Sequence, residues 1–236
     1  MTTGSWREEL IHSLSQAHSA EQVFAQTVAR VKALGFEHCS YGLCFAFPIT
    51  QPKVRILDTY PAPWRTRYRE QGYVSTDPTV LHGMKSPMPV VWEALSAHNR
   101  RLWEEARGHG LVHGWSRASR GELGVIGVFS VCRDVESISV KELDEIEPHL
   151  VWLSEHAHLG ISQRLMAQAV PKKALSAREI EVLRWTADGK TAAEIGAILQ
   201  LTERTVNFHV GNATEKLGVS NKTAAVLRAA MLGWLS

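Results

Sequence analysis

The chain has 236 residues, of which 44% are hydrophobic and 21% charged, and its formal net charge is +2. That length is enough for two domains, and the near-neutral charge excludes a protein that is basic throughout and binds nucleic acid non-specifically. The charge is uneven, because residues 172–236 hold nine Lys and Arg against six Asp and Glu (9 − 6 = +3), whereas residues 1–171 give 17 − 18 = −1.

Export and membrane insertion are not expected. The first residues, MTTGSWREELIHSL, carry charges and a histidine where a secretory signal needs an apolar core. No segment approaches the roughly 18 consecutive apolar residues of a membrane-spanning helix. Cys39, Cys44 and Cys132 have no metal-binding spacing, and their odd number indicates reduced, mostly buried thiols. The sequence therefore predicts a cytoplasmic protein with no membrane partner.

The first part of the chain mixes helix and strand signals. Ser19 and Gln22 form a capping box that opens a helix ending near Gly35. Two strand patterns follow, separated by Pro48 and Pro52. This spacing predicts an antiparallel hairpin with a long loop. The elements expected up to the middle of the chain are strands over 36–47 and 54–60, a helix over 62–71, a short helix opened by Asp77 and Pro78, and a helix over 97–108 ended by glycines.

A second hairpin and a long helix complete this part. The hairpin pairs residues 115–120 with 123–133 around Gly121, and the helix runs over 140–167. Its apolar stripe consists of Leu143, Ile146, Leu150, Leu153 and Leu165. The pattern predicts an α+β protein whose amino-terminal part is an α/β/α sandwich with an antiparallel sheet.

The last 60 or so residues carry four helix-start signals. Ser176 with Glu179 and Thr191 with Glu194 are capping boxes, and Thr202 is an N-cap. Asn221 or Ser220 can cap the last helix, and Gly189 ends the first. These signals predict an all-α four-helix domain in which residues 191–217 form a helix-turn-helix. The expected domains are 1–169 and 175–236, with a linker at 170–174.

The apolar residues of these helices predict which faces pack inward. Gly196 lies within a helix, where a close helix contact would explain it. The expected inward residues are Ile195, Ile198 and Leu199 of the second helix, Val206, Val210, Ala213 and Leu217 of the third, and Ala224, Val226, Leu227 and Ala230 of the fourth.

The third helix of this domain is the predicted DNA-recognition helix. Such a helix reads base edges mostly from its amino-terminal half, so Glu203, Arg204 and Asn207 are the leading candidates for base or phosphate contacts. Arg204 and three lysines are candidate phosphate contacts, each of which could equally be an ordinary solvated side chain. The remaining candidates at this interface are Lys190, Thr202, Phe208, Gly211, Lys216 and Lys222. A helical bundle with no nucleic-acid role is the alternative.

Residues 174–232 resemble the DNA-binding domain of the LuxR family. The resemblance rests on four motifs in order, namely LSxRExEVLxW, GKTxxEIG, TVxxHVxNxxEKLG and NKTxA. It implies that Glu179, Leu183 and Gly189 hold the fold, and that Val206, His209 and Leu217 belong to the recognition-helix signature, with His209 packed or hydrogen-bonded rather than reading bases. Gly211 departs from the family, which often has a larger polar residue there.

Residues 20–165 resemble the autoinducer-binding domain of the same family, as found in acyl-homoserine lactone receptors. The matching residues are Tyr60, Trp64, Tyr68, Asp77, Pro78, Trp92, Trp103 and Gly114. The resemblance implies that Trp64 donates to the lactone carbonyl, that Asp77 accepts from the amide N–H, and that Tyr60 and Ser130 meet the amide carbonyl. Tyr68, Trp92 and Trp103 would form the walls, and Ser40 and Gly42 would leave room for the acyl tail.

Each of these residues also has a structural explanation. Asp77 before Pro78 is a standard N-cap, although a carboxylate has two oxygens and can do both. Trp92 and Trp103 could be plain core residues, and Tyr60 and Trp64 a contact at a helix entry. Ser130 should point inward with Val128 and Cys132, where its hydroxyl needs a partner. An amphipathic lactone, for its part, requires an apolar cavity with a few polar groups.

Other chemistry has little support. Glycines around His109 and His113 argue against a zinc-binding helix, and His156 and His158 are expected to be solvated or interfacial. No enzyme signature and no cofactor motif is present. The expected protein is a homodimer, joined through helix 140–167 and part of the last helix of the chain. It is expected to bind a pseudo-palindromic DNA site and RNA polymerase when an acyl-homoserine lactone completes its core. The alternatives are a phosphorylated response regulator, and a LuxR-type protein that ignores lactones and binds another small molecule or a protein.

Overall fold

A computed structural model describes residues 5–45, 50, 52–121, 124–167, 171 and 173–235. The chain forms two compact units: the first takes in residues up to Leu165 apart from 122–124, and the second begins at Met166. The expected linker at 170–174 falls partly outside the described residues, so its bounds stay a prediction. In the described part of the chain, no helix combines the length and apolarity that crossing a membrane requires.

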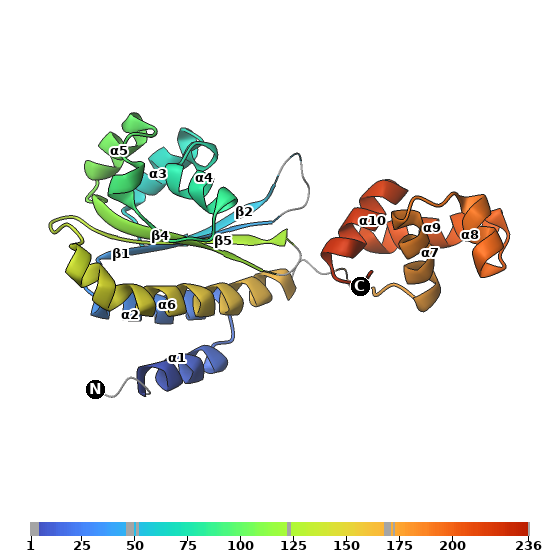
Figure 1. Cartoon of the computed structure of the whole chain (residues 1–236), viewed down its shortest axis with the longest axis horizontal. Helices are drawn as coiled ribbons and strands as arrows, with labels where there is room; N and C mark the ends of the chain where they lie inside the picture. Colours follow the sequence, from blue (N-terminus) through green and yellow to red (C-terminus); the bar gives the residue numbers. More distant parts are fainter. Residues whose placement is uncertain are drawn as a thin grey trace. The chain divides into compact units, whose positions relative to one another are not determined.

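The first unit is built on a five-stranded antiparallel sheet in the order β2-β1-β5-β4-β3. Helices α2 and α6 cover one face of this sheet, and α3, α4 and α5 cover the other (Figure 1). The predicted α/β/α sandwich is therefore confirmed. The strands are β1 (His38–Cys44), β2 (Val54–Asp58), β3 (Val90–Val91), β4 (His113–Arg120) and β5 (Ile126–Arg133).

The helices on the first face are α2 (Ala20–Ala33) and the long α6 (Val140–Ala167), with α1 (Ser5–Gln16) packed beyond them (Figure 1). The sequence analysis did not predict α1. Ser19 caps α2 as expected by accepting from the Gln22 backbone N–H, but the Gln22 side chain accepts from the backbone N–H of His18 rather than Ser19.

The other face carries α3 (Ala62–Glu70), α4 (Pro78–Lys85) and α5 (Arg100–Arg107), with the short turns η1 (Tyr73–Ser75) and η2 (Trp92–Leu95) between them. Helix α5 begins later than the predicted residue 97. Asn99 caps it with a left-handed backbone at φ 49°, and its side chain accepts from the Leu102 N–H. Asn tolerates this conformation better than most residues. A left-handed residue cannot continue a right-handed helix, so α5 begins only after Asn99.

The prediction for His158 was wrong. Its side chain is 1% exposed, and its Nδ1 lies 2.8 Å from the Tyr41 hydroxyl on β1. A Cβ at Gly127 would overlap this ring, so the glycine creates the space for it. Burial lowers the pKa of His158, which favours the neutral imidazole. His156, in contrast, is part-buried and bonds the Trp152 carbonyl.

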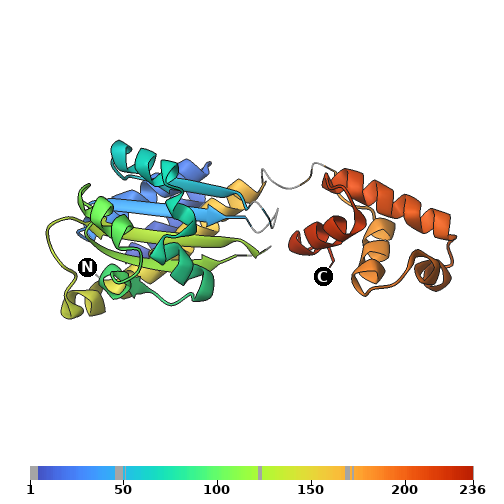
Figure 2. The ribbon, with the colours of Figure 1, turned by 90° about the horizontal axis from the view of Figure 1, so that it is seen from above.

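Over residues 173–235 the second unit forms four helices, α7 to α10, which Figure 2 shows from above. The predicted helix-turn-helix is confirmed by α8 and α9. Each helix begins with a side-chain cap: Ser176 and Thr191 in complete capping boxes, Thr202 and Asn221 as simple caps. The helices are α7 (Ala177–Ala187), α8 (Ala192–Leu199), α9 (Glu203–Leu217) and α10 (Lys222–Met231).

The inward face of α9 is as predicted, and those of α8 and α10 are partly right, since Ile195, Leu199 and Val226 pack in the core. In α10 the buried residues are Ala225 and Ala229, whereas Ala230 is exposed. Ile198 of α8 is 43% exposed, while Ile195 is buried. The close contact expected at Gly196 is real but involves the turn: a Cβ there would lie 2.7 Å from the Leu201 carbonyl oxygen.

Candidate functional site

The first unit contains a cavity of about 840 Å³ between the sheet and helices α3, α4 and α5. This volume is within the range of small-molecule sites. All eight predicted ligand-binding residues line it, although they come from six separate stretches of the chain. They are Ser40, Tyr60, Trp64, Tyr68, Asp77, Trp92, Trp103 and Ser130.

Aromatic side chains form one part of the cavity wall. The Trp92 and Trp103 rings lie 5.3 Å apart between centroids, and Trp64 meets Tyr68 edge-on at 5.8 Å. The three tryptophans are also members of one buried apolar cluster that includes Leu102 and Leu111. These tryptophans therefore line the cavity and belong to the core at once, and the cavity is a gap inside the core.

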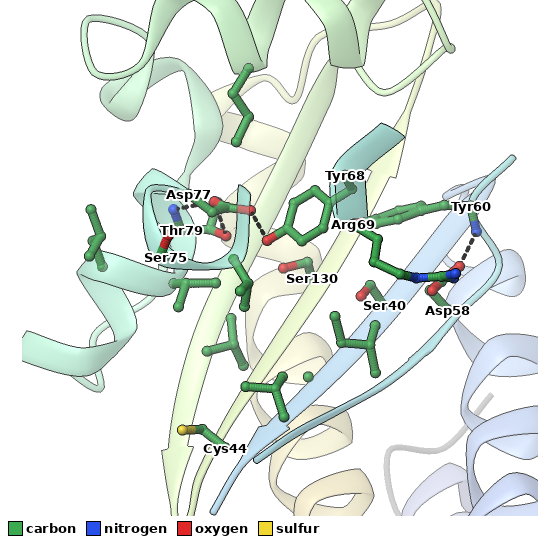
Figure 3. Close-up of a pocket in the computed structure, with 18 of the residues that line it drawn as sticks. Ser40, Cys44, Asp58, Tyr60, Tyr68, Arg69, Ser75, Asp77, Thr79 and Ser130 are labelled. Atoms are coloured by element: carbon green, nitrogen blue, oxygen red, sulfur yellow. Dashed lines mark hydrogen bonds between the residues drawn. The ribbon is translucent and has the colours of Figure 1, made fainter. Parts of the chain in front are cut away.

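Asp77 combines capping with a place in the cavity (Figure 3). One carboxylate oxygen accepts from the Thr79 backbone N–H at 2.8 Å and from the Thr79 hydroxyl at 2.7 Å, while the other accepts from the Tyr68 hydroxyl at 2.9 Å. Burial raises the pKa of Asp77, and the hydrogen bonds from Thr79 and Tyr68 oppose that rise. The result is a part-buried acceptor held in place by its neighbours.

Ser130 has the partner that its inward position requires. Its hydroxyl lies 2.8 Å from that of Ser116, which in turn accepts from the Trp92 indole N–H at 2.7 Å. Trp92 packs directly on Gly114, because a Cβ at that glycine would overlap the indole. The sequence analysis singled out neither Ser116 nor its bond to Trp92.

Asp58 and Arg69 form a second polar group in the cavity lining, close to Tyr60. The Asp58 carboxylate accepts from the Tyr60 backbone N–H at 3.1 Å, and the Arg69 side chain extends toward it (Figure 3). Asp58, Arg69 and Thr79 line the cavity and were missed from sequence. Thr79 could have been found as the residue two places after an Asp N-cap, whereas Arg69 has no local signal.

The predicted DNA-contact residues of α9 lie at its surface. Glu203, Arg204 and Asn207 are exposed, and the Phe208 side chain is 62% exposed. Gly211 is exposed one turn further along, and a Cβ there would meet nothing within 4 Å. Thr202, at the start of α9, accepts from the Thr205 N–H, and the part-buried His209 meets the Phe208 ring edge-on.

The basic candidates divide into two kinds. Lys222 is exposed at the start of α10, and Lys190 is part-buried just before α8. Lys216 is different, because its ammonium lies 2.7 Å from the Glu179 carboxylate, whose side chain is 4% exposed. The expected phosphate contact by Lys216 is therefore corrected to a structural ion pair between α9 and α7.

The response-regulator alternative fails on the fold, because it requires a parallel sheet, whereas every strand pair among the described residues is antiparallel. His113 lies at the start of β4 and contacts Glu93 at 2.7 Å. In the part of the chain that the structure describes, no group of three or more His, Cys, Asp or Glu side chains could hold a metal ion. The cysteines are free, with Cys39 and Cys132 buried and Cys44 part-buried.

Known proteins resemble both units. Residues 19–161 match the family described as autoinducer binding domain, and residues 173–229 match bacterial regulatory proteins of the luxR family. The transcriptional activator protein AnoR of Acinetobacter nosocomialis is 39% identical over 236 residues, which cover 98% of this chain and 99% of that protein. The quorum-sensing regulator RhlR of Pseudomonas aeruginosa is 39% identical over 233 residues, which cover 97% and 95% of the two chains.

Solved structures agree with these sequences. The crystal structure of Escherichia coli SdiA superimposes with a TM-score of 0.89 at 30% identity, with 100% of both chains covered. SdiA in complex with octanoyl-rac-glycerol gives 0.85 at 30% identity, covering 98% of this chain and 96% of that one. These relatives are transcriptional regulators and not enzymes. The chain belongs to the LuxR family of quorum-sensing transcriptional regulators, with an autoinducer-binding domain followed by a helix-turn-helix DNA-binding domain.

Proposed function

We propose that the autoinducer of this protein is an N-acyl-homoserine lactone, held by Trp64, Asp77, Tyr60 and Ser130. This proposal rests on one observation: three indole N–H groups lie near the cavity, and only two of them donate to an acceptor in the protein. Trp92 donates to Ser116 and Trp103 donates to the Leu95 carbonyl, whereas Trp64 has no acceptor among the described residues and lines the cavity. The Trp64 N–H can only donate, and the cavity that Trp64 lines is where it can meet an acceptor, so a ligand oxygen is its natural partner.

The rest of the head group fits the same cavity. The amide N–H of the ligand donates to Asp77, whose carboxylate is fixed by Thr79 and Tyr68 and needs no rearrangement. The amide carbonyl accepts from Ser130, with Tyr60 beside it. The acyl tail lies along the apolar part of the lining, where Gly42, Ile56 and Val128 contribute carbon surface or empty space.

A monoacylglycerol is the second candidate. The relative SdiA has been solved with octanoyl-rac-glycerol, a ligand that also joins a polar head to an acyl tail. It has an ester in place of the amide and therefore no N–H for Asp77. The two ligands can be told apart by whether Asp77 contributes to binding as an acceptor.

Thermal unfolding of the full chain with a series of lactones tests the proposal. A ligand at 100 times its Kd should raise the Tm by about 5–10 °C for a protein of this size. Trp64→Phe, which removes the free N–H, should lower lactone affinity about tenfold. Trp115→Phe, which removes an N–H already bound to Glu147 from a tryptophan outside the cavity lining, is the matched control. Absence of a shift with every lactone, together with a shift by octanoylglycerol, would replace the lactone with the monoacylglycerol.

We further propose that the liganded protein is a cytoplasmic homodimer that places two α9 helices on a pseudo-palindromic site with half-sites about one helical turn apart. The exposed Leu159 on α6 supports this helix as part of the interface. RNA polymerase is the proposed partner at the promoter. Native mass spectrometry with ligand and operator should show two chains per duplex, and a one-to-one complex would contradict the dimer.

A further inference from the structure

A row of three serines crosses the pocket floor on adjacent strands. Ser40 of β1 pairs in register with Ser130 of β5, and Ser130 pairs in register with Ser116 of β4. Residues directly opposite each other on neighbouring strands point to the same face of a sheet, so the three hydroxyls lie in one line. Ser40 and Ser130 line the cavity, and Figure 3 shows their hydroxyls on neighbouring strands.

The hydrogens of this row can be assigned by counting donors and acceptors. The Trp92 indole N–H can only donate, and it donates to the Ser116 oxygen at 2.7 Å. Ser116 is 1% exposed and has one hydrogen of its own. Among the described residues, the acceptor within its reach is the Ser130 oxygen at 2.8 Å. If Ser130 donated to Ser116 instead, the Ser116 hydrogen would be buried without a partner, which is unfavourable.

Ser116 therefore donates to Ser130, and the Ser130 hydrogen is left over. Ser130 is 6% exposed and meets no acceptor within the described part of the chain. Its exposed edge is the one that lines the cavity. The Ser130 hydroxyl thus faces the cavity as a donor, while its oxygen is occupied from behind by Ser116.

We propose that Trp92 and Ser116 are positioning residues that orient the Ser130 hydroxyl as a hydrogen-bond donor, so that this part of the pocket selects ligands with an acceptor oxygen. The inference rests on the proposed function, in which that oxygen is the amide carbonyl of the lactone. Without the bonds from Trp92 and Ser116, the Ser130 hydroxyl could rotate and present either a hydrogen or a lone pair. The selection for an acceptor would then weaken.

A pair of ligands that differ in one atom tests this role. N-octanoyl-homoserine lactone and its thioamide analogue share their head, tail and N–H, but sulfur is a much weaker acceptor than the carbonyl oxygen. Calorimetric titration of the full chain gives the ratio of the two dissociation constants. We expect the wild type to prefer the amide by about three- to tenfold, the factor that one neutral hydrogen bond provides.

The variants separate orientation from general support of the fold. Ser130→Ala should abolish the preference, Ser116→Ala should reduce it at least twofold, and Ser116→Thr, which keeps the hydroxyl, should restore it. Trp92→Phe keeps an aromatic wall but removes the N–H, so it should reduce the preference even if Ser116→Ala does not fold. The matched control is Ser119→Ala, which removes a buried hydroxyl from the same strand, where Ser119 bonds Glu155 rather than the row; its ratio should equal that of the wild type.

The two possible failures give different results. If Ser116→Ala and Trp92→Phe weaken binding of both ligands equally, the positioning role is overturned although the lactone still binds. If the wild type binds neither ligand, the proposed function itself is overturned and this inference with it.

Discussion

The two units of this protein differ in whether the residues of the site are also residues of the core. In the second unit, Arg204, Asn207 and Phe208 are exposed, while separate residues such as Val206 and Leu217 pack inside. In the first unit, Trp64, Trp92 and Trp103 line the cavity and belong to a buried apolar cluster.

This difference has a consequence for substitutions. A residue on the exposed face of α9 can change with little effect on stability, because surface substitutions usually alter it by less than about 0.5 kcal/mol. A residue of the pocket cannot change without disturbing the packing that holds the unit together. Four experiments can break or sharpen this comparison.

The largest effect should come from Lys216→Met in the second unit. Removal of one partner of a buried ion pair leaves a buried charge and typically costs about 3–5 kcal/mol of stability. The cost here should be lower, because the Ser176 backbone N–H still donates to the Glu179 carboxylate. Lys222→Met is the matched control, because this exposed lysine has no ion pair among the described residues. Urea denaturation measures the free energy of unfolding of both variants. If both lose an equal, small amount, the residues that hold this fold are not separate from those of its surface.

The same pair gives a pH dependence. Burial raises the pKa of Glu179, but the bonds from Lys216 and Ser176 more than offset this, so the pKa lies below its usual value. The stabilisation is therefore present above the unfolded-state pKa of about 4.3 and is lost as the pH falls through the lower folded value. In Lys216→Met the contribution of Lys216 is lost, while the burial and the bond from Ser176 remain. The folded-state pKa of Glu179 is then higher than in the wild type, so the stability deficit of the variant should shrink as the pH is lowered toward 4.

Asp77→Ala should follow, with a loss of about 2–3 kcal/mol from the N-cap and the unpaired Tyr68 and Thr79 groups. Lactone binding should fall with it, since one carboxylate serves both. Asp77→Asn keeps an oxygen for the cap and is the control. Stability unchanged in Asp77→Ala, with binding lost, would mean that site and core are separable in this unit too.

Arg204→Ala should lower operator affinity by about 1–3 kcal/mol, or roughly 5- to 150-fold, if Arg204 contacts a base. Its free energy of unfolding and its Tm shift with lactone should not change. Fluorescence anisotropy with a labelled operator duplex measures the affinity. Undiminished binding would remove Arg204 from the interface.

The smallest effect should come from Gly211, and Gly196 on the neighbouring helix should give the opposite sign. Gly211→Ala should raise the free energy of unfolding by about 0.8–1 kcal/mol, because Ala has the better helix propensity and the new Cβ meets nothing. Gly196→Ala should lower it, because its Cβ would lie 2.7 Å from the Leu201 oxygen. Urea denaturation of both variants gives the signs, and equal signs would contradict this account.

The second unit was largely predictable from residue patterns because its signals are local. Each cap and its acceptor or donor lie within three residues, as in Ser176 with Glu179 and Thr191 with Glu194. The errors came from ambiguity and distance. Helix α10 has small apolar residues on adjacent faces, so Ala230 was predicted to face inward in place of Ala225 and Ala229. Lys216 pairs with a residue 37 positions away.

The pocket could be predicted only through resemblance. Asp77 had a local explanation as a cap, but nothing near it in sequence places it in one cavity with Tyr60 and Ser130. Ser116 was missed because its position beside Ser130 arises from strand register. Arg69 was missed because no local pattern indicates that it lines the cavity. His158 was misjudged because the glycine that gives it room, Gly127, lies on another element.

Gly114 offers a route by which such a receptor could change its specificity during evolution. Any side chain at this position would displace the Trp92 ring and with it the N–H that reaches Ser116. A single change at a residue outside the lining could therefore alter which ligands are accepted, while every residue around the cavity stayed the same. Receptors with identical pockets could in this way answer different signals.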